Sequence, residues 1–511
     1  MTDWTSGYVA DIGYTYGYYA ELSPLRARLA LLNARLALPK SGTACELGFG
    51  QGMSANIHAA ASTTKWYGTD FNPSQAGFAQ HLAESFSNSP QLFDQSFAEF
   101  CARDDLPDFD YIGLHGIWSW ISDENRAIIV DFVRRKLKVG GVLYISYNTQ
   151  PGWASMVPVR DLLTQHADVM APPGAGVVAR VDGALAFARK LWHSNPAYAR
   201  ANPQLGERLK AISEQNRHYV AHEYFNRDWV PMSFAEMAES LAPAKIDFAC
   251  SATYIEHVNN VHMTAEQVAI LDELPDPTFR QSVRDFMVNQ QFRRDYWVKG
   301  PRQLNALEYS EQTRAQRVVL AIPRSSVTLT VKGTLGTANL AEAVYNPLLD
   351  LMSDFKVRSL GEIELALREH AISLAQLHQA AMVLIEKAVL APAHDEAVIS
   401  ACREDTMKLN RALLERARGS SDIAYLASPV LGSSVVLSRF HQLMLLAILA
   451  GKKTPEEWAE YTWAILKSQQ QAVVKDGKGL EGDAENLAEL TIHANKLQGE
   501  NIAILRALGV M

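Results

Sequence analysis

The chain has 511 residues, of which 48 % are hydrophobic and 20 % are charged, and its formal net charge is −8. This is ordinary globular composition, and the length suggests about two to four domains. The acidic balance argues against a nucleic-acid partner, because neutralising phosphates requires a basic surface.

The cysteine count and the apolar stretches limit the cellular setting. The chain has 4 cysteines and none forms a CxxC pair, so neither a disulfide framework nor a zinc cluster is indicated. This usage fits a reducing cytoplasm, and the N-terminal residues show no signal peptide. Residues 440–451 are strongly apolar but too few to span a bilayer, so we expect a buried helix there and no membrane partner.

Predicted strands and helices alternate through the first 150 residues. In chain order we expect a helix at 22–38, a strand at 43–48, a helix at 53–61, a strand at 65–71, a strand running into a loop at 109–121, a helix at 123–137 and a strand at 140–148. This alternation is typical of an α/β fold, in which a mostly parallel sheet carries helices on both faces.

The remaining chain is predicted to be mainly helical. Residues 155–226 are helical with a loop signal at 171–176, and 245–255 form one strand. Two β-rich runs lie within 301–340, and a winged-helix-like module is one interpretation of this part. Further along, Thr454 begins a helix, and 481–508 predict one long helix that suits domain or subunit contact. We therefore divide the chain into residues 1–154, 155–300 and 301–511.

A glycine-rich turn follows the first predicted strand. Gly48, Gly50 and Gly52 leave room for a ligand beside the N-terminus of the next helix. Either a dinucleotide or S-adenosylmethionine uses such a turn. The spacing is not the G-x-G-x-x-G of dinucleotide sites, and Glu46 before the turn suits a ligand with an ammonium group. Asp70, at the end of the next strand, can accept ribose hydroxyls in either case.

These residues resemble a known family. "CELGFGQGMS" (45–54) and "YGTDFNP" (67–73) are similar to motif I and the acidic second motif of class I S-adenosylmethionine-dependent methyltransferases. "LHGIWSWIS" (114–122), "SYNTQPGW" (146–153) and "YVAHEYFN" (219–226) resemble bacterial members with a methyltransferase regulatory domain, a group that includes the rickettsial protein-lysine methyltransferases. The resemblance covers roughly residues 10–300. It implies a Rossmann-like cofactor-binding domain in 1–154 and a helical lid and regulatory domain in 155–300.

The resemblance also implies roles for individual residues. The expected cofactor-binding residues are Glu46, Gly48, Gly50, Gly52, Asp70, Phe71, Ser96, Phe97, His115 and Gly116. The expected catalytic residues are His115, Tyr16 and Tyr19. The expected substrate-side residues are Tyr14, Trp118, Trp120, Tyr147 and Trp153. For Phe97, Trp118 and Trp120 the alternative role is packing in the protein interior.

Two smaller features have competing interpretations. Tyr14, Tyr16, Tyr18 and Tyr19 form either an aromatic lid over a sulfonium cation or an N-terminal arm packed on the domain. The His222–Glu223 pair has Asn226 where a second metal ligand would stand, so we expect a structural helix pair and no metal site.

The resemblance therefore favours an enzyme that uses S-adenosylmethionine, with S-adenosylhomocysteine as its product, to N-methylate lysine side chains of a protein substrate. A small-molecule or glycan acceptor is one alternative, and a non-catalytic cofactor-binding protein with an interaction module is another. A nicotinamide-dependent oxidoreductase is opposed by the glycine spacing and by Glu46. A homodimer remains open.

Overall fold

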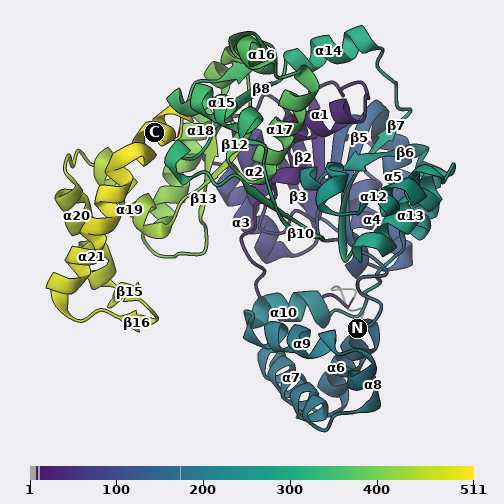
Figure 1. Cartoon of the computed structure of the whole chain (residues 1–511). Helices are drawn as coiled ribbons and strands as arrows, with labels where there is room; N and C mark the ends of the chain where they lie inside the picture. Colours follow the sequence, from purple (N-terminus) through teal and green to yellow (C-terminus); the bar gives the residue numbers. More distant parts are fainter. Residues whose placement is uncertain (1–6, 10–11, 173) are drawn as a thin grey trace.

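A seven-stranded sheet forms the centre of the protein, which is described as a computed structural model over residues 7–9, 12–172 and 174–511 (Figure 1). The strand order is β3-β2-β1-β4-β5-β7-β6, and only β7 runs antiparallel to its neighbours. The strands are β1 (Thr43–Leu47), β2 (Lys65–Asp70), β3 (Gln91–Asp94), β4 (Phe109–Leu114), β5 (Leu137–Asn148), β6 (Ile246–Ser251) and β7 (Phe292–Lys299). The expected α/β fold with a mostly parallel sheet is confirmed.

Helices cover the sheet and connect its parallel strands. They are α1 (Pro24–Asn33), α2 (Met53–Ala60), α3 (Pro73–Ala83), α4 (Phe97–Cys101) and α5 (Asp123–Lys136). Helix α2 follows the glycine turn directly and every one of its residues is buried. The N-terminus of α2 therefore lies at the carboxyl end of β1, where open α/β sheets bind ligands.

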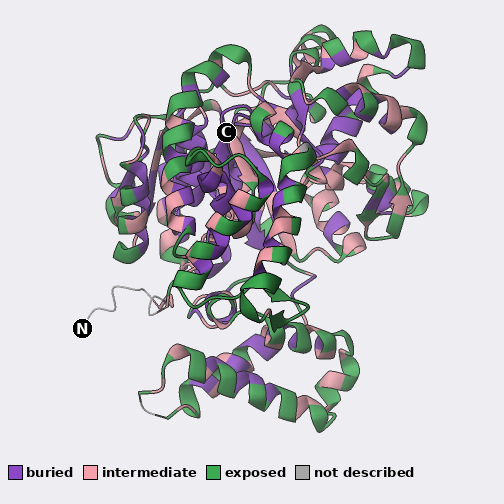
Figure 2. Cartoon of the chain, turned by 90° about the vertical axis from the view of Figure 1, so that its left-hand side faces the viewer, coloured by how far each residue is buried: buried purple, intermediate pink, exposed green. Residues whose placement is uncertain are grey.

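A group of five helices, which we call the helical insertion, follows β5 in the chain and precedes the last two strands of the sheet. It contains α6 (Val157–Val169), α7 (Val177–His193), α8 (Ala197–Ala201), α9 (Gln204–Glu214) and α10 (Arg217–Tyr224), and it lies below the sheet in Figure 1. The insertion encloses a hydrophobic core of its own, visible as its buried interior in Figure 2. The predicted break at 171–176 lies between α6 and α7.

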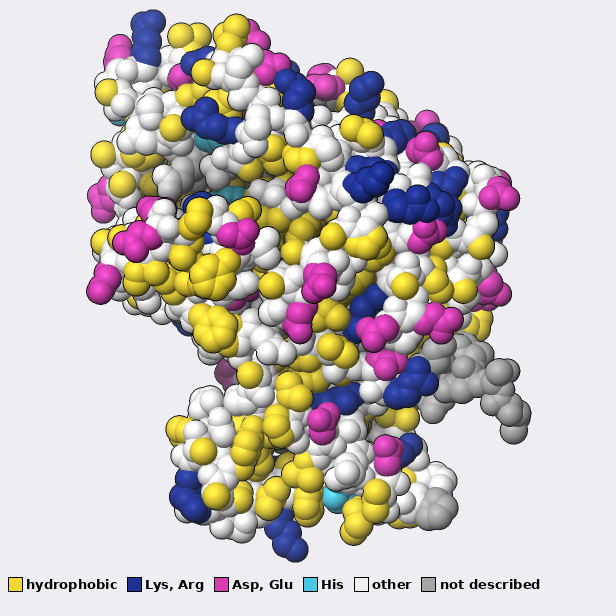
Figure 3. Space-filling model, turned by 90° about the vertical axis from the view of Figure 1, so that its right-hand side faces the viewer, with side chains coloured by type: hydrophobic (Ala, Val, Ile, Leu, Met, Phe, Trp, Pro, Cys, Tyr) yellow, Lys and Arg dark blue, Asp and Glu magenta, His cyan; other side chains and the backbone are white. Residues whose placement is uncertain are grey.

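The chain then returns to complete the sheet. Helix α11 (Phe234–Leu241) precedes β6, while α12 (Ala265–Asp272) and α13 (Pro277–Val288) lead into β7. The main sheet thus continues past the division that we propose at residue 154. On the face shown in Figure 3, Lys and Arg side chains lie among Asp and Glu side chains.

The C-terminal half begins with a small mixed unit. A three-stranded antiparallel sheet has the order β11-β8-β12, and β9 and β10 form a separate hairpin. The elements are α14 (Ala306–Arg314), β8 (Arg317–Leu320), β9 (Thr330–Gly333), β10 (Gly336–Asn339), α15 (Glu342–Leu351), β11 (Arg358–Ser359), α16 (Leu360–Ala366), α17 (Leu374–Glu386) and β12 (Leu390–Ala393). The winged-helix-like interpretation of this unit stays a prediction.

Helix α17 is largely buried in this unit. Its His378 side chain lies within 3.0 Å of the Leu29 carbonyl of α1. The helix before β12 therefore packs against α1, which covers the main sheet.

A helical layer completes the chain. It contains α18 (Glu396–Ala417), β13 (Tyr425–Ser428), β14 (Ser433–Val436), α19 (Arg439–Leu449), α20 (Pro455–Ser468), β15 (Val474–Lys475), β16 (Lys478–Gly479), α21 (Gly482–Lys496) and α22 (Ile502–Ala507). The apolar stretch near residue 440 is helix α19, whose central residues are buried, and Thr454 caps α20 with Glu457 as predicted. Among the described residues, no helix is long and apolar enough to cross a membrane.

One predicted helix is divided in two. The expected helix over 481–508 is interrupted at Gly499, whose ψ of −134° is not helical. The chain turns there, which lets Ile502, Ile504 and Leu505 of α22 reach the core. Periodicity alone predicts a continuous helix, because the apolar spacing continues on both sides of the glycine.

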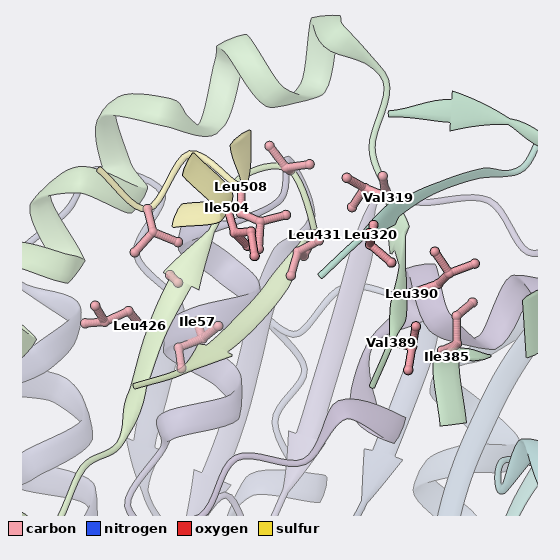
Figure 4. Packing of buried hydrophobic residues seen from close by; sticks show 14 of the residues in the cluster. Ile57, Val319, Leu320, Ile385, Val389, Leu390, Leu426, Leu431, Ile504 and Leu508 are labelled. Atoms are coloured by element: carbon pink, nitrogen blue, oxygen red, sulfur yellow. The ribbon is translucent and has the colours of Figure 1, made fainter. Parts of the chain in front are cut away.

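One hydrophobic core joins the C-terminal half to helices α1 and α2. Figure 4 shows Ile57 of α2 close to Leu426 of β13, with Ile504 and Leu508 nearby. The same core continues through Leu320 of β8 and its neighbours toward β12. The C-terminal half and the glycine-turn helix therefore share one packed interior.

Candidate active site

The glycine turn adopts a backbone that requires glycine. Gly48, Gly50 and Gly52 have φ values of 73°, 57° and 67°, in the left-handed region. A Cβ atom at Gly48 would lie 2.5 Å from Ile117 Cδ1, and one at Gly52 would lie 2.4 Å from Ala79 Cβ. At Gly50 the nearest atom would be 3.7 Å away, because this residue borders an open cavity.

Two carboxylates lie beside the turn, one on β1 and one at the end of β2. Asp70 accepts hydrogen bonds from the backbone N–H groups of Gly50 (2.8 Å) and Asn72 (3.0 Å). The Oε2 atom of Glu46 is buried and has no hydrogen-bond partner among the described residues. Burial, with a contribution from the charge of Asp70, raises the pKa of Glu46 to about 8. Burial also raises the pKa of Asp70 to about 7, against the hydrogen bonds that it accepts.

A single cavity collects most of the predicted site residues. Those that line it are Tyr14, Tyr19, Glu46, Gly48, Gly50, Asp70, Phe71, Ser96, Phe97, His115, Gly116 and Trp120. They come from the N-terminal arm and from the segments that follow β1, β2, β3 and β4. Residues far apart in the sequence thus meet at the carboxyl ends of the parallel strands, as open α/β sheets arrange their ligand sites.

A stack of rings forms one wall of the cavity. The ring of Tyr19 lies parallel to that of His115, with 3.7 Å between their centroids, and His115 Nδ1 is 2.7 Å from the Tyr144 hydroxyl. Tyr14 and Tyr19 share a side-chain hydrogen bond. Burial lowers the pKa of His115 to about 3, so this imidazole is neutral at neutral pH and a weak proton acceptor.

Backbone conformation and helix capping position three further lining residues, Gly116, Ser96 and Phe97. Gly116 has a φ of 66°, and its N–H donates to Ser146 Oγ at 2.8 Å. Ser96 caps α4 in a reciprocal arrangement with Glu99. Phe97, the first residue of α4, is half-buried, lines the cavity and also packs against a hydrophobic core. Both interpretations of Phe97 thus have a structural basis.

Three of the predicted substrate-side residues lie inside the protein instead of at the cavity. Trp118 is fully buried, with its Nε1 3.3 Å from Met232 Sδ. Tyr147 is also fully buried, and its hydroxyl donates to Asp295 at 3.0 Å. Trp153 packs in the core of the helical insertion. Aromatic residues in a motif have two competing uses, and here packing accounts for all three.

Tyr16 and Tyr18 hold the N-terminal arm to other parts of the chain. The hydroxyl of Tyr16 accepts a hydrogen bond from Arg416 Nη2 at 2.9 Å, and its ring packs on Phe78 of α3. The hydroxyl of Tyr18 lies 2.9 Å from His58 Nε2. Neither residue lines the cavity, whereas Tyr14 and Tyr19 of the same arm do. The structure therefore separates Tyr16 from the other two expected catalytic residues.

The cavity is also lined by residues that the sequence analysis does not predict. They are Tyr8, Thr15, Gly17, Phe49, Gln51, Gln75, Gln95, Ile117, Ile121, Ser122, Asn125 and Asp228. Most are direct neighbours of predicted residues, so the motifs could have been extended by a few positions. Asp228 follows the "YVAHEYFN" segment at only a short distance, and Tyr8 belongs to the aromatic N-terminal arm.

Acidic side chains line the cavity. Glu46, Asp70 and Asp228 contribute carboxylates, and no Lys or Arg occurs among the described residues that line it. Asp228 is paired with Arg227, whose Nη2 lies 3.1 Å away. The cavity thus favours ligands that carry positive charge.

The His222–Glu223 pair lies beside this cavity on α10. His222 packs its ring against Tyr8 and Tyr14, with centroids 5.5 and 5.0 Å away, and its Nε2 is 3.2 Å from the Ile12 carbonyl. In the described ranges there is no group of three or more His, Cys, Asp or Glu side chains that could hold a metal ion.

Comparisons with known proteins match this geometry. Residues 216–299 match the family model described as a predicted methyltransferase regulatory domain. The protein sll1526 of Synechocystis sp. is 38 % identical over 512 residues, covering 99 % of this chain and 99 % of that protein. The protein RP789 of Rickettsia prowazekii is 27 % identical over 198 residues, covering 38 % of this chain and 35 % of that protein.

A solved structure covers nearly the whole chain. PKMT2 from Rickettsia typhi, in complex with AdoHcy, superposes with a TM-score of 0.70 at 16 % identity, over 97 % of this chain and 100 % of that one. The two proteins share one fold from the central sheet through the C-terminal half.

The strand order, the reversed β7 and the acid-flanked glycine turn together define a class I S-adenosylmethionine-dependent methyltransferase. The chain belongs to the same family as sll1526, to which it is similar over nearly its whole length, and its residues 216–299 match the methyltransferase regulatory domain.

Proposed function

We propose that the residues around the glycine turn hold S-adenosylmethionine. The unpartnered Glu46 oxygen fits the cofactor's ammonium group, and the Asp70 carboxylate fits its ribose hydroxyls. The free N–H groups at the start of α2 fit its carboxylate. Phe71 and Phe97 offer faces for the adenine, and Ser96 and Gly116 complete this part of the wall.

When bound, the cofactor supplies a methyl group activated by its positively charged sulfur. The protein therefore needs no covalent nucleophile and acts by aligning the acceptor and excluding water. The stacked pair Tyr19–His115 faces the cavity with neutral aromatic rings, which attract cations. Tyr14 and Trp120 extend this aromatic wall.

We further propose that the acceptor is the amine of a lysine side chain in a protein. The observation that carries this proposal is the composition of the cavity: carboxylates and aromatic rings line it, without Lys or Arg among the described lining residues. Such a cavity attracts a cationic side chain. Aromatic walls also desolvate its ammonium, which lowers the lysine pKa toward the neutral, nucleophilic amine.

The similarity to known proteins also favours a protein substrate. The superposed structure over the whole chain bears the name PKMT2, and its likeness to the present fold includes the C-terminal half. A protein substrate needs a larger docking surface than a metabolite does, and the helical insertion borders the cavity through α10. A small-molecule or glycan acceptor is the rival outcome of the test below.

The decisive experiment measures transfer of radiolabelled methyl from S-adenosylmethionine into cell lysate, separated into protein, nucleic-acid and small-molecule fractions. We expect base-stable label in protein that appears as methyl-lysine after hydrolysis. Asp70→Asn protein serves as the control, in which weaker cofactor binding should strongly reduce labelling at low cofactor concentration. Label confined to the small-molecule fraction would overturn the lysine proposal and leave the cofactor assignment intact.

A further inference from the structure

One acidic side chain near the cavity has no role in the arrangement described so far. Glu223 lies near the end of α10, and its backbone carbonyl accepts a hydrogen bond from Trp120 Nε1 at 3.1 Å. Trp120 lines the cavity. The preceding residue, His222, packs against the cavity residues Tyr8 and Tyr14. Two independent contacts thus fix this turn of α10 against the cavity wall.

The Glu223 carboxylate is half-buried and has no hydrogen bond or ion pair with any described residue. Its charge acts on the hydroxyls of Tyr8, Tyr14 and Tyr19, all of which line the cavity. Burial raises the pKa of Glu223 to about 7. The half-buried carboxylate therefore has no cation paired with it among the described residues, while the backbone of its helix turn contacts the cavity wall through Trp120.

The other acids of the cavity already have functions or partners. Glu46 and Asp70 flank the glycine turn, where we place the cofactor, and Asp228 pairs with Arg227. Among the described residues around the cavity, Glu223 is therefore the acid left without an assigned cation. A half-buried carboxylate without a partner destabilises a fold, which argues that it is kept for a ligand.

We propose that Glu223 binds the positively charged amine of the methyl acceptor on the α10 side of the cavity. This proposal rests on the proposed function, because it supplies the acceptor site that a lysine methyltransferase needs. It assigns the regulatory-domain segment, which begins at residue 216, a direct part in substrate binding. The ligand class is a primary ammonium at the end of an unbranched alkyl chain.

Two cofactor analogues test this proposal without requiring activity. AdoHcy lacks the transferred methyl, whereas sinefungin carries a primary amine at that position. We would measure the affinity of both by calorimetry for the wild-type protein, for Glu223→Gln and for Glu214→Gln. Glu214 is an exposed acid on α9 of the same insertion, and it provides the same change of charge away from the cavity.

We expect Glu223→Gln to weaken sinefungin binding at least about tenfold while AdoHcy binding changes less than twofold. Glu214→Gln should change neither affinity, and Glu223→Asp should restore part of the preference for sinefungin. The thermal midpoint of Glu223→Gln should equal or exceed that of the wild type, because an unpaired carboxylate is removed. A purely structural role predicts a lower midpoint and no change in the sinefungin preference.

The outcomes separate this proposal from the proposed function. Unchanged sinefungin preference in Glu223→Gln, with tight AdoHcy binding throughout, would overturn the role of Glu223 alone. A wild-type protein that binds AdoHcy but has no affinity for sinefungin would do the same. Failure of the wild type to bind AdoHcy would overturn the cofactor assignment, and with it both proposals.

Discussion

The helical insertion and the C-terminal half are both attached to the central sheet, but they are joined to it in different ways. The insertion has a hydrophobic core of its own, which reaches the rest of the protein through Trp120, Trp153 and Trp229. The C-terminal half has no separate core, since its buried residues are continuous with those of α1 and α2. Polar contacts strengthen this second junction: Asp405 of α18 accepts from the N–H groups of Ser87 (2.9 Å) and Asn88 (2.8 Å).

The N-terminal arm connects the two regions across the cavity. Its first described part, with Tyr8 and Ile12, packs against the core of the insertion, and Tyr18 and Tyr19 pack against the shared core. The comparison teaches that the C-terminal half is part of the folding unit that carries the cofactor turn. The insertion is a separately packed body that meets the cavity through α10 and the arm, as expected of a lid.

The largest expected effect comes from emptying each core in turn. Leu426→Ala in β13 should cost about 2–5 kcal/mol and destabilise the unit that includes the glycine turn. Leu163→Ala in α6 removes the same side-chain volume from the core of the insertion. Hydrogen exchange should then show loss of protection in α2 for Leu426→Ala and in α6–α10 alone for Leu163→Ala. Loss of protection throughout the chain in both variants would contradict the comparison.

A substitution of Asp70, at the end of β2, should weaken cofactor binding without destabilising the helical insertion or the C-terminal half. Asp70→Asn keeps an acceptor oxygen but loses the charge, and we expect S-adenosylmethionine affinity to fall about 10- to 150-fold, since hydrogen bonds to charged groups contribute about 1.5–3 kcal/mol. Asp94→Asn, at the exposed end of the adjacent β3, is the matched control. Calorimetry at constant pH measures both, and equal affinity of the Asp70 variant would refute its assignment.

Sequence patterns predict the strand, turn and helix around Asp70 and the glycines, because each of these segments is local. A strand, a glycine turn and a buried helix are encoded within residues 43–61, and the acid at the end of β2 follows the same rule. The patterns missed β3, where only Leu92 is buried. They also missed β7, whose Arg293 and Asp295 read as surface residues. These two form a fully buried ion pair at 2.8 Å, which no single-segment pattern reveals.

Sequence patterns predict the cavity wall around Trp120 and α10 less completely, because it depends on contacts between distant segments. Trp118 and Trp120 are two residues apart, yet one is enclosed in a core and the other lines the cavity. Which of the two reaches the cavity depends on how Ile117 and the following turn are oriented against Gly48. The sequence around Glu223 predicts only a structural helix pair with His222, because the proximity of Glu223 to Trp120 is a property of the fold.

The raised pKa of Glu46 should make the stability of the folded protein depend on pH. In the unfolded chain this carboxyl ionises near its usual pKa of 4.5, whereas the folded protein without cofactor retains the proton to about pH 8. The folded state therefore binds more protons within this window, and its stability falls as the pH rises. We expect the thermal midpoint to drop by roughly a few degrees between pH 5 and pH 8. Glu46→Gln should make that slope shallower, with the remainder contributed by Asp70 and Glu223, whose pKa values are also raised, and an identical slope in both proteins would contradict the assignment.

The smallest effect tests how the C-terminal half supports the arm. Arg416 of α18 donates to the Tyr16 hydroxyl at 2.9 Å, and its guanidinium lies 4.7 Å from the centre of the Phe78 ring. Removing it in Arg416→Ala should loosen the arm that places Tyr14 and Tyr19 at the cavity. We expect cofactor affinity to fall roughly fivefold, the equivalent of about 1 kcal/mol.

The control for this substitution is Arg403→Ala, on the exposed side of the same helix. Both variants remove one positive charge from α18, so a difference between them reports the contact with the arm and not the net charge. The thermal midpoint should change little in either, because the shared core is intact. If Arg416→Ala bound the cofactor as the wild type does, the C-terminal half would stabilise the fold of the cofactor unit without positioning the wall of its cavity.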